Sequence, residues 1–223
     1  NTLSVFYITH KVVHMNRLLS NAPTRRSTLR RGLVSLGAAA ALVLAHAPSA
    51  AADYYPYGNG STYFTTQIIG SNSTWTSRLN FGRTAWSSVS SISGTSSSNV
   101  KKAKDVAVTQ PWLGLYTPSG TRAARSFTIQ VNRTAISKAS ASSGVAVDLI
   151  AKGTATHEFG HALSLADNPT TSAASIMKYS TSLSRTTPYA YDFDGVRRYY
   201  GSLCSPTTQC PVSIPTSILK GSL

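Results

Sequence analysis

The sequence is poor in several residue types that ordinarily carry chemistry. Its 223 residues include seven acidic residues against 21 lysines and arginines, and only two cysteines and two methionines. Glu158 is the single glutamate. Cys204 and Cys210 are too few and too near the end for a structural zinc site, although they could close a small disulfide loop in an exported protein. No phosphate-binding glycine loop and no internal repeat is present.

Histidine is also scarce, and its distribution excludes one class of hydrolase. Three of the five histidines, His10, His14 and His46, lie in an N-terminal region that we expect to be removed. The remaining pair is His157 and His161. If both bind a metal, neither is left to act as the base of a serine or cysteine protease.

The N-terminal region is typical of an export signal. Basic residues at 25–31 precede an apolar run at 33–47, and small residues follow at 47–52. The run has about fifteen residues, fewer than the ~20 that cross a bilayer. We therefore predict an N-terminal extension with a signal peptide over 1–52, one domain over 53–203 and a short tail over 204–223. The mature protein would be secreted and extracellular, without a membrane span.

Removal of this region lowers the positive charge. Six of the 21 basic residues and none of the seven acidic residues precede residue 51, so the remainder carries a net charge of +8. Apart from Lys101, Lys102 and Lys104 the basic residues are scattered, and no nucleic-acid-binding motif is present. We expect no nucleic-acid partner, and at most loose attraction to an anionic surface.

The chemistry concentrates in residues 157–161, which read H-E-x-x-H. Residues four apart on a helix share a face, so His157 and His161 can direct their rings at one ion while Glu158 lies beside it. This pattern is typical of hydrolases in which zinc activates a water molecule. The alternative is an ordinary helix with two hydrogen-bonded histidines. The position of the only glutamate and of both remaining histidines within five residues argues against that alternative.

Catalytic zinc usually has three protein ligands. No glutamate follows Glu158, which excludes the zinc peptidases that take one from a later helix. The longer pattern H-E-x-x-H-x-x-G-x-x-H would place Ser164 at the glycine and Asp167 at the last histidine. The sequence thus resembles a metzincin zinc metalloprotease of the matrixin-like or snapalysin-like bacterial secreted type, with aspartate as third zinc ligand. Asp192 and Asp194 are rival ligands, and Asp167 could instead be a turn residue.

A second metzincin landmark follows at residues 175–179. This segment resembles the Met-turn, in which a methionine, here Met177, forms a hydrophobic floor beneath the metal. In some relatives a tyrosine two places later reaches the zinc or the substrate, and Tyr179 matches that position. A phenol there could donate a hydrogen bond to the developing oxyanion. The alternative is a packed aromatic side chain. Ser164 departs from the pattern, because a left-handed turn costs a residue other than glycine about 1–2 kcal/mol.

The resemblance implies an α+β fold of the metzincin (zincin) type, with a small twisted mixed sheet, an active-site helix, the Met-turn and a C-terminal helix. It also implies a secreted zinc-dependent endopeptidase, monomeric and acting on a protein or peptide, with Zn²⁺ held by His157, His161 and Asp167. Glu158 would be the general base. Two alternatives stay open: a catalytically inactive metzincin-fold binding module at an anionic surface, and a hydrolase whose substrate is not a peptide.

Spacing of apolar residues predicts the elements. Helices are expected at 75–92, 144–164 and 191–201, strands at 105–109, 112–116 and 127–132, and loops at 87–99 and 135–143. Following the resemblance, we expect strand 127–132 to offer an edge to the substrate.

Overall fold

The computed structural model describes residues 54–168, 171–178 and 182–201, which form a mixed α+β fold. The expected signal peptide, Tyr179 and both cysteines lie outside the described residues. The elements are β1 (Tyr63–Ile69), α1 (Ser73–Thr84), β2 (Ser91–Thr95), β3 (Lys101–Val106), β4 (Gly114–Ser119), β5 (Ser126–Asn132), α2 (Arg133–Ser143), α3 (Val147–Ala162) and α4 (Ala190–Gly201). None of the helices in the described segments has the length and apolar character needed to cross a bilayer.

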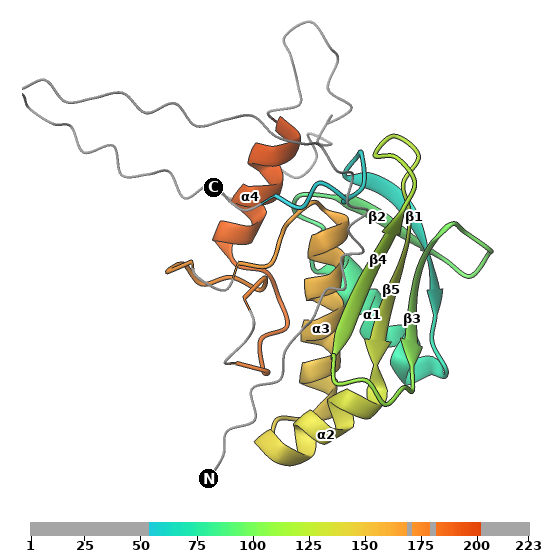
Figure 1. Ribbon diagram of the computed structural model, residues 1–223, viewed down its shortest axis with the longest axis vertical. Coiled ribbons are helices and arrows are strands. Elements are labelled where there is room, and N and C mark those ends of the chain that lie inside the picture. The colour runs from blue at the N-terminus through green and yellow to red at the C-terminus, as the bar shows by residue number, and fades with distance from the viewer. Residues whose placement is uncertain (1–53, 169–170, 179–181, 202–223) are drawn as a thin grey trace, which may run out of the picture. The chain divides into compact units, whose positions relative to one another are not determined.

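The five strands form one mostly parallel sheet in the order β2-β1-β3-β5-β4. β1 pairs in parallel with β2 and β3, and β3 with β5, whereas β4 is antiparallel to β5. Because β5 is paired on both sides, the prediction that strand 127–132 offers an edge to the substrate is wrong. The strand at that side of the sheet is β4 (Figure 1).

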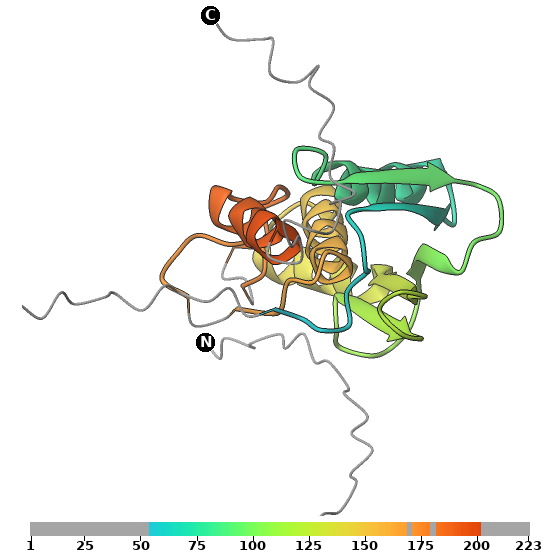
Figure 2. The same ribbon diagram turned by 90° about the horizontal axis from the view of Figure 1, so that it is seen from above.

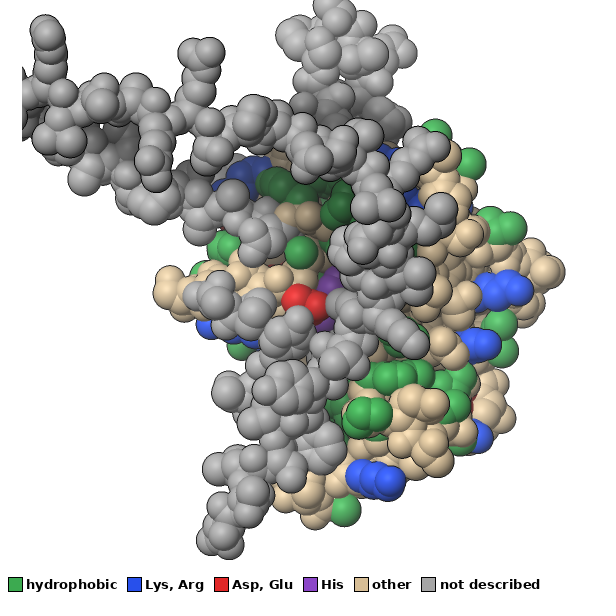
Figure 3. Space-filling view, in the orientation of Figure 1, with side chains coloured by type: hydrophobic (Ala, Val, Ile, Leu, Met, Phe, Trp, Pro, Cys, Tyr) green, Lys and Arg blue, Asp and Glu red, His purple; other side chains and the backbone are tan. Residues whose placement is uncertain are grey.

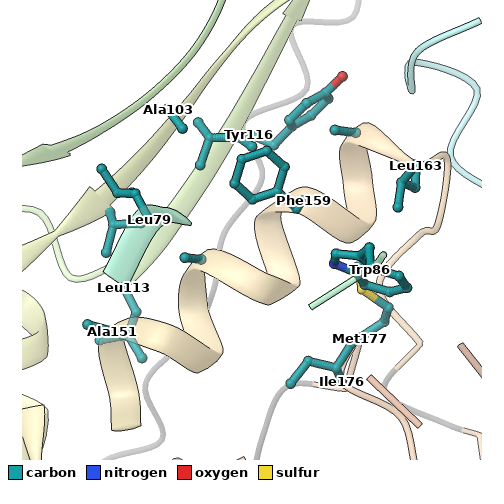
Figure 4. Close-up of a cluster of buried hydrophobic side chains, with 14 of the residues drawn as sticks. Leu79, Trp86, Ala103, Leu113, Tyr116, Ala151, Phe159, Leu163, Ile176 and Met177 are labelled. Carbon is teal, nitrogen blue, oxygen red and sulfur yellow. The ribbon is translucent and has the colours of Figure 1, made fainter. Parts of the chain in front are cut away.

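Helix α3 runs between the sheet and α4, as both ribbon views show (Figures 1 and 2). Phe159 is fully buried on it, in the same core cluster as Leu79 of α1 and Trp86 (Figure 4). Helices α1 and α3 approach closely at Gly82 of α1, where an added Cβ would lie 2.5 Å from the Cβ of Ala155 of α3. The core therefore fixes the position of α3, which carries the H-E-x-x-H motif.

The N-terminal half differs from the sequence-based expectation in three places. The first helix ends at Thr84 rather than near residue 92, because the chain turns there into β2. The expected loop at 87–99 therefore contains a strand. β1 was not expected, since its alternating pattern of buried and partly exposed residues is weak. The expected strands at 105–109 and 112–116 are β3 and β4, each displaced by a few residues.

The second expected loop, at 135–143, is the helix α2. Asn132 caps it by accepting a hydrogen bond from the backbone N–H of Thr134 at 3.2 Å. Gly144 ends it in the left-handed conformation, with φ of 73°. The buried face of this helix consists of Ala135, Ile136 and Ala139, and Ile136 is its only large apolar residue. The sequence therefore shows no clear helical period of apolar residues. The expected helices at 144–164 and 191–201 are confirmed as α3 and α4.

Candidate metal centre

The two histidines of the motif lie on one face of α3, as their spacing predicts. The rings of His157 and His161 are 4.8 Å apart between centroids and nearly perpendicular, at 81°. One ligand atom from each, together with a carboxylate oxygen of Glu158, lie within 4.8 Å of one another, and all three residues are buried. This buried His-Glu-His cluster could hold a metal ion.

Backbone carbonyls orient both imidazoles. The Nδ1 of His157 lies 2.8 Å from the carbonyl oxygen of Ile176, and the Nδ1 of His161 lies 2.8 Å from that of Leu165. A carbonyl only accepts hydrogen bonds, so each Nδ1 carries a proton, and each Nε2 is the ring nitrogen left to bind a metal once its own proton is lost. Metal-binding histidines are commonly fixed by such a hydrogen bond from the second ring nitrogen.

Asp167, predicted as the third ligand, lies next to both histidines. Its Oδ1 lies 3.0 Å from the Nε2 of His157 and 3.6 Å from the Nε2 of His161. In a tetrahedral zinc site with metal–ligand distances of about 2.0–2.2 Å, two ligand atoms are about 3.3–3.5 Å apart. The two observed separations lie within about 0.3 Å of that range, and two imidazoles with a carboxylate are ligand types found in metal sites.

The turn that carries Asp167 back to the histidines has the backbone that the longer motif requires. Ser164, at the glycine position of that motif, has φ of 65° and is the only described residue other than glycine with positive φ. Its hydroxyl lies 3.1 Å from that of Tyr200. Serine thus adopts the left-handed conformation that the sequence analysis identified as costly.

The charges around His157 favour a cation. Burial lowers the pKa of His157, but the hydrogen bond with Asp167 and the negative charges of Glu158 and Asp167 outweigh it and raise the pKa to about 9. The same carboxylates that hold a proton on this imidazole would hold a metal ion in its place.

Glu158, the third member of the cluster, lies against strand β4. A Cβ added to Gly114 would lie 2.3 Å from the Oε1 of Glu158 and 2.6 Å from a methyl carbon of Thr154. Gly114 therefore leaves the space that this carboxylate occupies. The Glu158 side chain is fully buried.

The segment predicted as the Met-turn packs directly beneath the histidines. A Cβ added to Gly160, which lies between His157 and His161 on the helix, would be 2.4 Å from the Sδ of Met177 and 3.1 Å from the Trp86 ring. Figure 4 shows Met177 and Trp86 on the same side of the helix. Gly160 weakens the helix locally, and this close packing is what it allows.

The two rival aspartates are engaged elsewhere. Asp192 is buried and accepts hydrogen bonds from the hydroxyl of Ser175 and from the backbone N–H groups of Ile176, at 2.9 Å, and Tyr189, at 2.8 Å. Asp194 is exposed and pairs with Arg197 at 2.9 Å. Asp192 therefore anchors the segment whose carbonyl receives the His157 proton.

Residues 54–60 lie against this centre, which the sequence analysis did not anticipate. The backbone N–H of Tyr55 donates to the carbonyl of Ser164 at 2.9 Å, and Tyr54 forms a β-bridge with Leu165. The Tyr55 and His161 rings are 5.4 Å apart. Burial, together with Tyr57, Asp167 and Glu158, raises the pKa of Tyr55 to about 12. Three tyrosines within four residues were the only sequence signal of this role.

The cluster residues themselves are buried, with relative exposures of 4% or less. In the space-filling view an acidic side chain and a histidine side chain are visible next to each other near the middle of the face shown (Figure 3). No protein-family model matches this sequence, and no curated protein matches it.

Proposed function

We propose that this protein is a secreted, zinc-dependent endopeptidase of the metzincin type, in which His157, His161 and Asp167 bind the metal. The observation that carries the proposal is the position of the Asp167 Oδ1 at 3.0 Å and 3.6 Å from the two histidine Nε2 atoms. The carbonyl-bound Nδ1 atoms, the left-handed turn at Ser164 and the methionine beneath the helix support the same family.

Held by His157, His161 and Asp167, a zinc ion would supply Lewis-acid chemistry, polarising the scissile carbonyl and lowering the pKa of a water molecule. Glu158 removes a proton from the attacking water and passes it to the leaving amine. One of its carboxylate oxygens lies within 4.8 Å of a ring nitrogen of each histidine, near enough to act on a water at the metal. Close packing of the buried glutamate against Gly114 restricts the positions open to the carboxylate, which favours a preorganised base.

The substrate would bind along β4. This strand ends the sheet, and its other side pairs only with β5 in the described part of the chain. An extended peptide can add to such an edge through backbone hydrogen bonds. Because Gly114 of β4 adjoins Glu158, a peptide paired there passes close to the proposed base. We therefore assign to β4 the pairing with substrate that was expected for strand 127–132.

The decisive experiment combines metal analysis with casein cleavage in the presence and absence of a strong chelator. We expect about one zinc per chain and activity that the chelator abolishes and zinc restores. Glu158→Gln should keep the zinc and lower the turnover number at least 100-fold, because general base catalysis contributes about 10²–10⁴-fold.

Two other outcomes would each contradict the proposal. Stoichiometric zinc without hydrolysis of casein or of a peptide library would indicate a binding module. Proteolysis that persists in Glu158→Gln, or in chelator, would remove the proposed mechanism.

A further inference from the structure

Tyr200, in the last turn of α4, brings its hydroxyl between two other segments of the chain. Its side chain is buried, with 6% exposure. The hydroxyl oxygen lies 2.7 Å from the backbone carbonyl oxygen of Asn59 and 3.1 Å from the hydroxyl oxygen of Ser164, and both of these residues are buried as well. The Tyr200 hydroxyl therefore joins α4 both to segment 54–60 and to the turn that precedes Asp167.

The directions of these two hydrogen bonds follow from the number of protons. A neutral phenol has one proton to donate, and a carbonyl oxygen can only accept. The Tyr200 hydroxyl therefore donates to the Asn59 carbonyl, and the Ser164 hydroxyl donates to the phenol oxygen. Asn59 is held at its other backbone group too, because its N–H donates to the carbonyl of Ala162 at 2.8 Å.

Ser164 connects this hydrogen bond to the proposed metal ligands. Its backbone N–H donates to the carbonyl of His161 at 3.0 Å, and the carbonyl of the next residue, Leu165, lies 2.8 Å from the Nδ1 of the same histidine. Asp167 follows two residues later, with its Oδ1 close to the Nε2 atoms of both histidines. Because Ser164 has a left-handed backbone, a contact that fixes its side chain also restrains the path of the chain toward Asp167.

The two ends of α4 are attached to the metal centre in similar ways. In the first turn, Asp192 accepts a hydrogen bond from Ile176, whose carbonyl orients His157. In the last turn, Tyr200 binds Ser164, next to the carbonyl that orients the second histidine. Helix α4 supplies none of the proposed ligands, yet it contacts both of the segments that hold them in place.

We propose that Tyr200 is a positioning residue of the metal centre, whose hydroxyl holds the Ser164 turn so that Asp167 stays next to the two histidines. The inference rests on the metal site of the proposed function and adds to it a residue that lies outside the H-E-x-x-H pattern and its longer form. Because Tyr200 acts through the turn, its loss should change the affinity and the geometry of the bound metal.

The test compares Tyr200→Phe with the matched variant Tyr116→Phe in the full chain. Phenylalanine keeps each ring and removes only the hydroxyl. Tyr116 is a suitable control because it is buried and its hydroxyl also donates to a carbonyl of segment 54–60, that of Tyr57, at 3.0 Å. In the absence of metal we expect both variants to lose about 2–8 °C in Tm, since each loses one buried hydrogen bond.

Metal binding should distinguish the two variants. The Kd for zinc, measured by competition with a chromogenic chelator, should rise about 10- to 100-fold in Tyr200→Phe, as is typical when a group that orients the ligands is lost, and change less than about threefold in Tyr116→Phe. The visible absorption of Co²⁺ bound in place of zinc reports the ligand geometry, and it should change in Tyr200→Phe alone. A role in folding stability only would lower both Tm values and leave both metal readouts as in the parent.

A double-mutant cycle tests the route through Ser164. Ser164→Ala removes the same hydrogen bond from its other side, so it should also raise the zinc Kd by at least about threefold, and it keeps the inference testable if Tyr200→Phe does not fold. In the double variant Ser164→Ala/Tyr200→Phe the Kd should rise by less than the product of the two single effects. A rise equal to that product would refute the connection between the two residues.

The results separate the inference from the proposed function. If the parent chain binds no zinc, the proposed metal site fails and the inference fails with it. If the parent binds zinc and Tyr200→Phe keeps the parent Kd and Co²⁺ spectrum, or Tyr116→Phe loses as much affinity, only the inference is overturned. A parent that binds zinc but cleaves no peptide, together with the expected loss of affinity in Tyr200→Phe, would refute the peptidase function and support the inference.

Discussion

Replacement of Asp192 by asparagine tests how α4 supports the metal centre. Asp192 is 2% exposed, and its carboxylate accepts three hydrogen bonds. Two of them come from the backbone N–H groups of Ile176 and Tyr189. One of these donors is Ile176, whose carbonyl accepts the Nδ1 proton of His157 at 2.8 Å. Replacement of Asp192 should therefore disturb the proposed metal ligand His157 through Ile176, which contacts both residues.

The magnitude follows from the number of bonds to a buried charge. Hydrogen bonds to charged groups contribute about 1.5–3 kcal/mol each, and asparagine keeps one oxygen while it places an NH₂ group where an acceptor stood. We expect Asp192→Asn to lose about 2–4 kcal/mol of unfolding free energy in urea. Loss of a group that orients a ligand typically weakens metal binding about 10- to 100-fold.

Asp194→Asn is the matched control, since Asp194 lies two residues further along the same helix. Its side chain is 60% exposed and pairs with Arg197, so its replacement should change stability by less than about 0.5 kcal/mol. Zinc affinity would be measured by competition with a chromogenic chelator. If Asp192→Asn loses stability but binds zinc as tightly as the parent, the proposed connection through Ile176 to His157 is refuted.

The remaining predictions concern the turn and an ion pair. Ser164→Gly relieves about 1–2 kcal/mol of backbone strain but loses the hydrogen bond to Tyr200, whereas Ser164→Ala loses that bond and keeps the strain. In urea unfolding the alanine variant should therefore be about 1–2 kcal/mol less stable than the glycine variant, and equal stability would contradict the strain argument. The hydrogen bond with Lys152 lowers the pKa of Asp148, burial raises it, and the hydrogen bond with Arg78 lowers it again, so that the pKa lies below its usual value. Stability from this pair is present above the unfolded-state pKa of about 4 and is lost as the pH falls through the lower folded-state value. Asp148→Asn should consequently cost less than about 1 kcal/mol at pH 7 and almost nothing at pH 2, as thermal unfolding at the two pH values would show.

Local spacing was sufficient to predict most of the metal centre. His157 and His161 lie one turn apart on α3, and Glu158 directly follows His157. The helical period alone therefore places the two imidazoles on the same face of the helix. Asp167 follows the left-handed turn at Ser164, and the longer motif predicted that this turn brings its side chain close to the two histidines. The Nδ1 partners were beyond prediction, because they are backbone carbonyls whose positions depend on how Ile176 and Leu165 are held.

Elements without a strong apolar period were predicted poorly. α2 is composed mainly of serine and alanine, and its cap Asn132 is also the last residue of a strand, so the sequence shows no boundary between them. The edge strand was misassigned because strand order depends on pairing between distant segments. β5 has the alternation of a strand with one buried face, and this pattern does not distinguish a central strand from an edge strand.

Serine is acceptable at the glycine position of the motif because other segments hold the turn. The backbone N–H of Leu165 donates to the carbonyl of Gly160 at 3.0 Å, so the helix end itself closes the turn. On its outer side, the Tyr55 N–H binds the Ser164 carbonyl, and Gly58 lies so close that an added Cβ would be 2.2 Å from the Ser164 hydroxyl oxygen. A strained backbone persists where its surroundings fix it from several directions. Segment 54–60 therefore supports serine at position 164, and the contacts that hold the strained turn also hold Asp167 next to the two histidines.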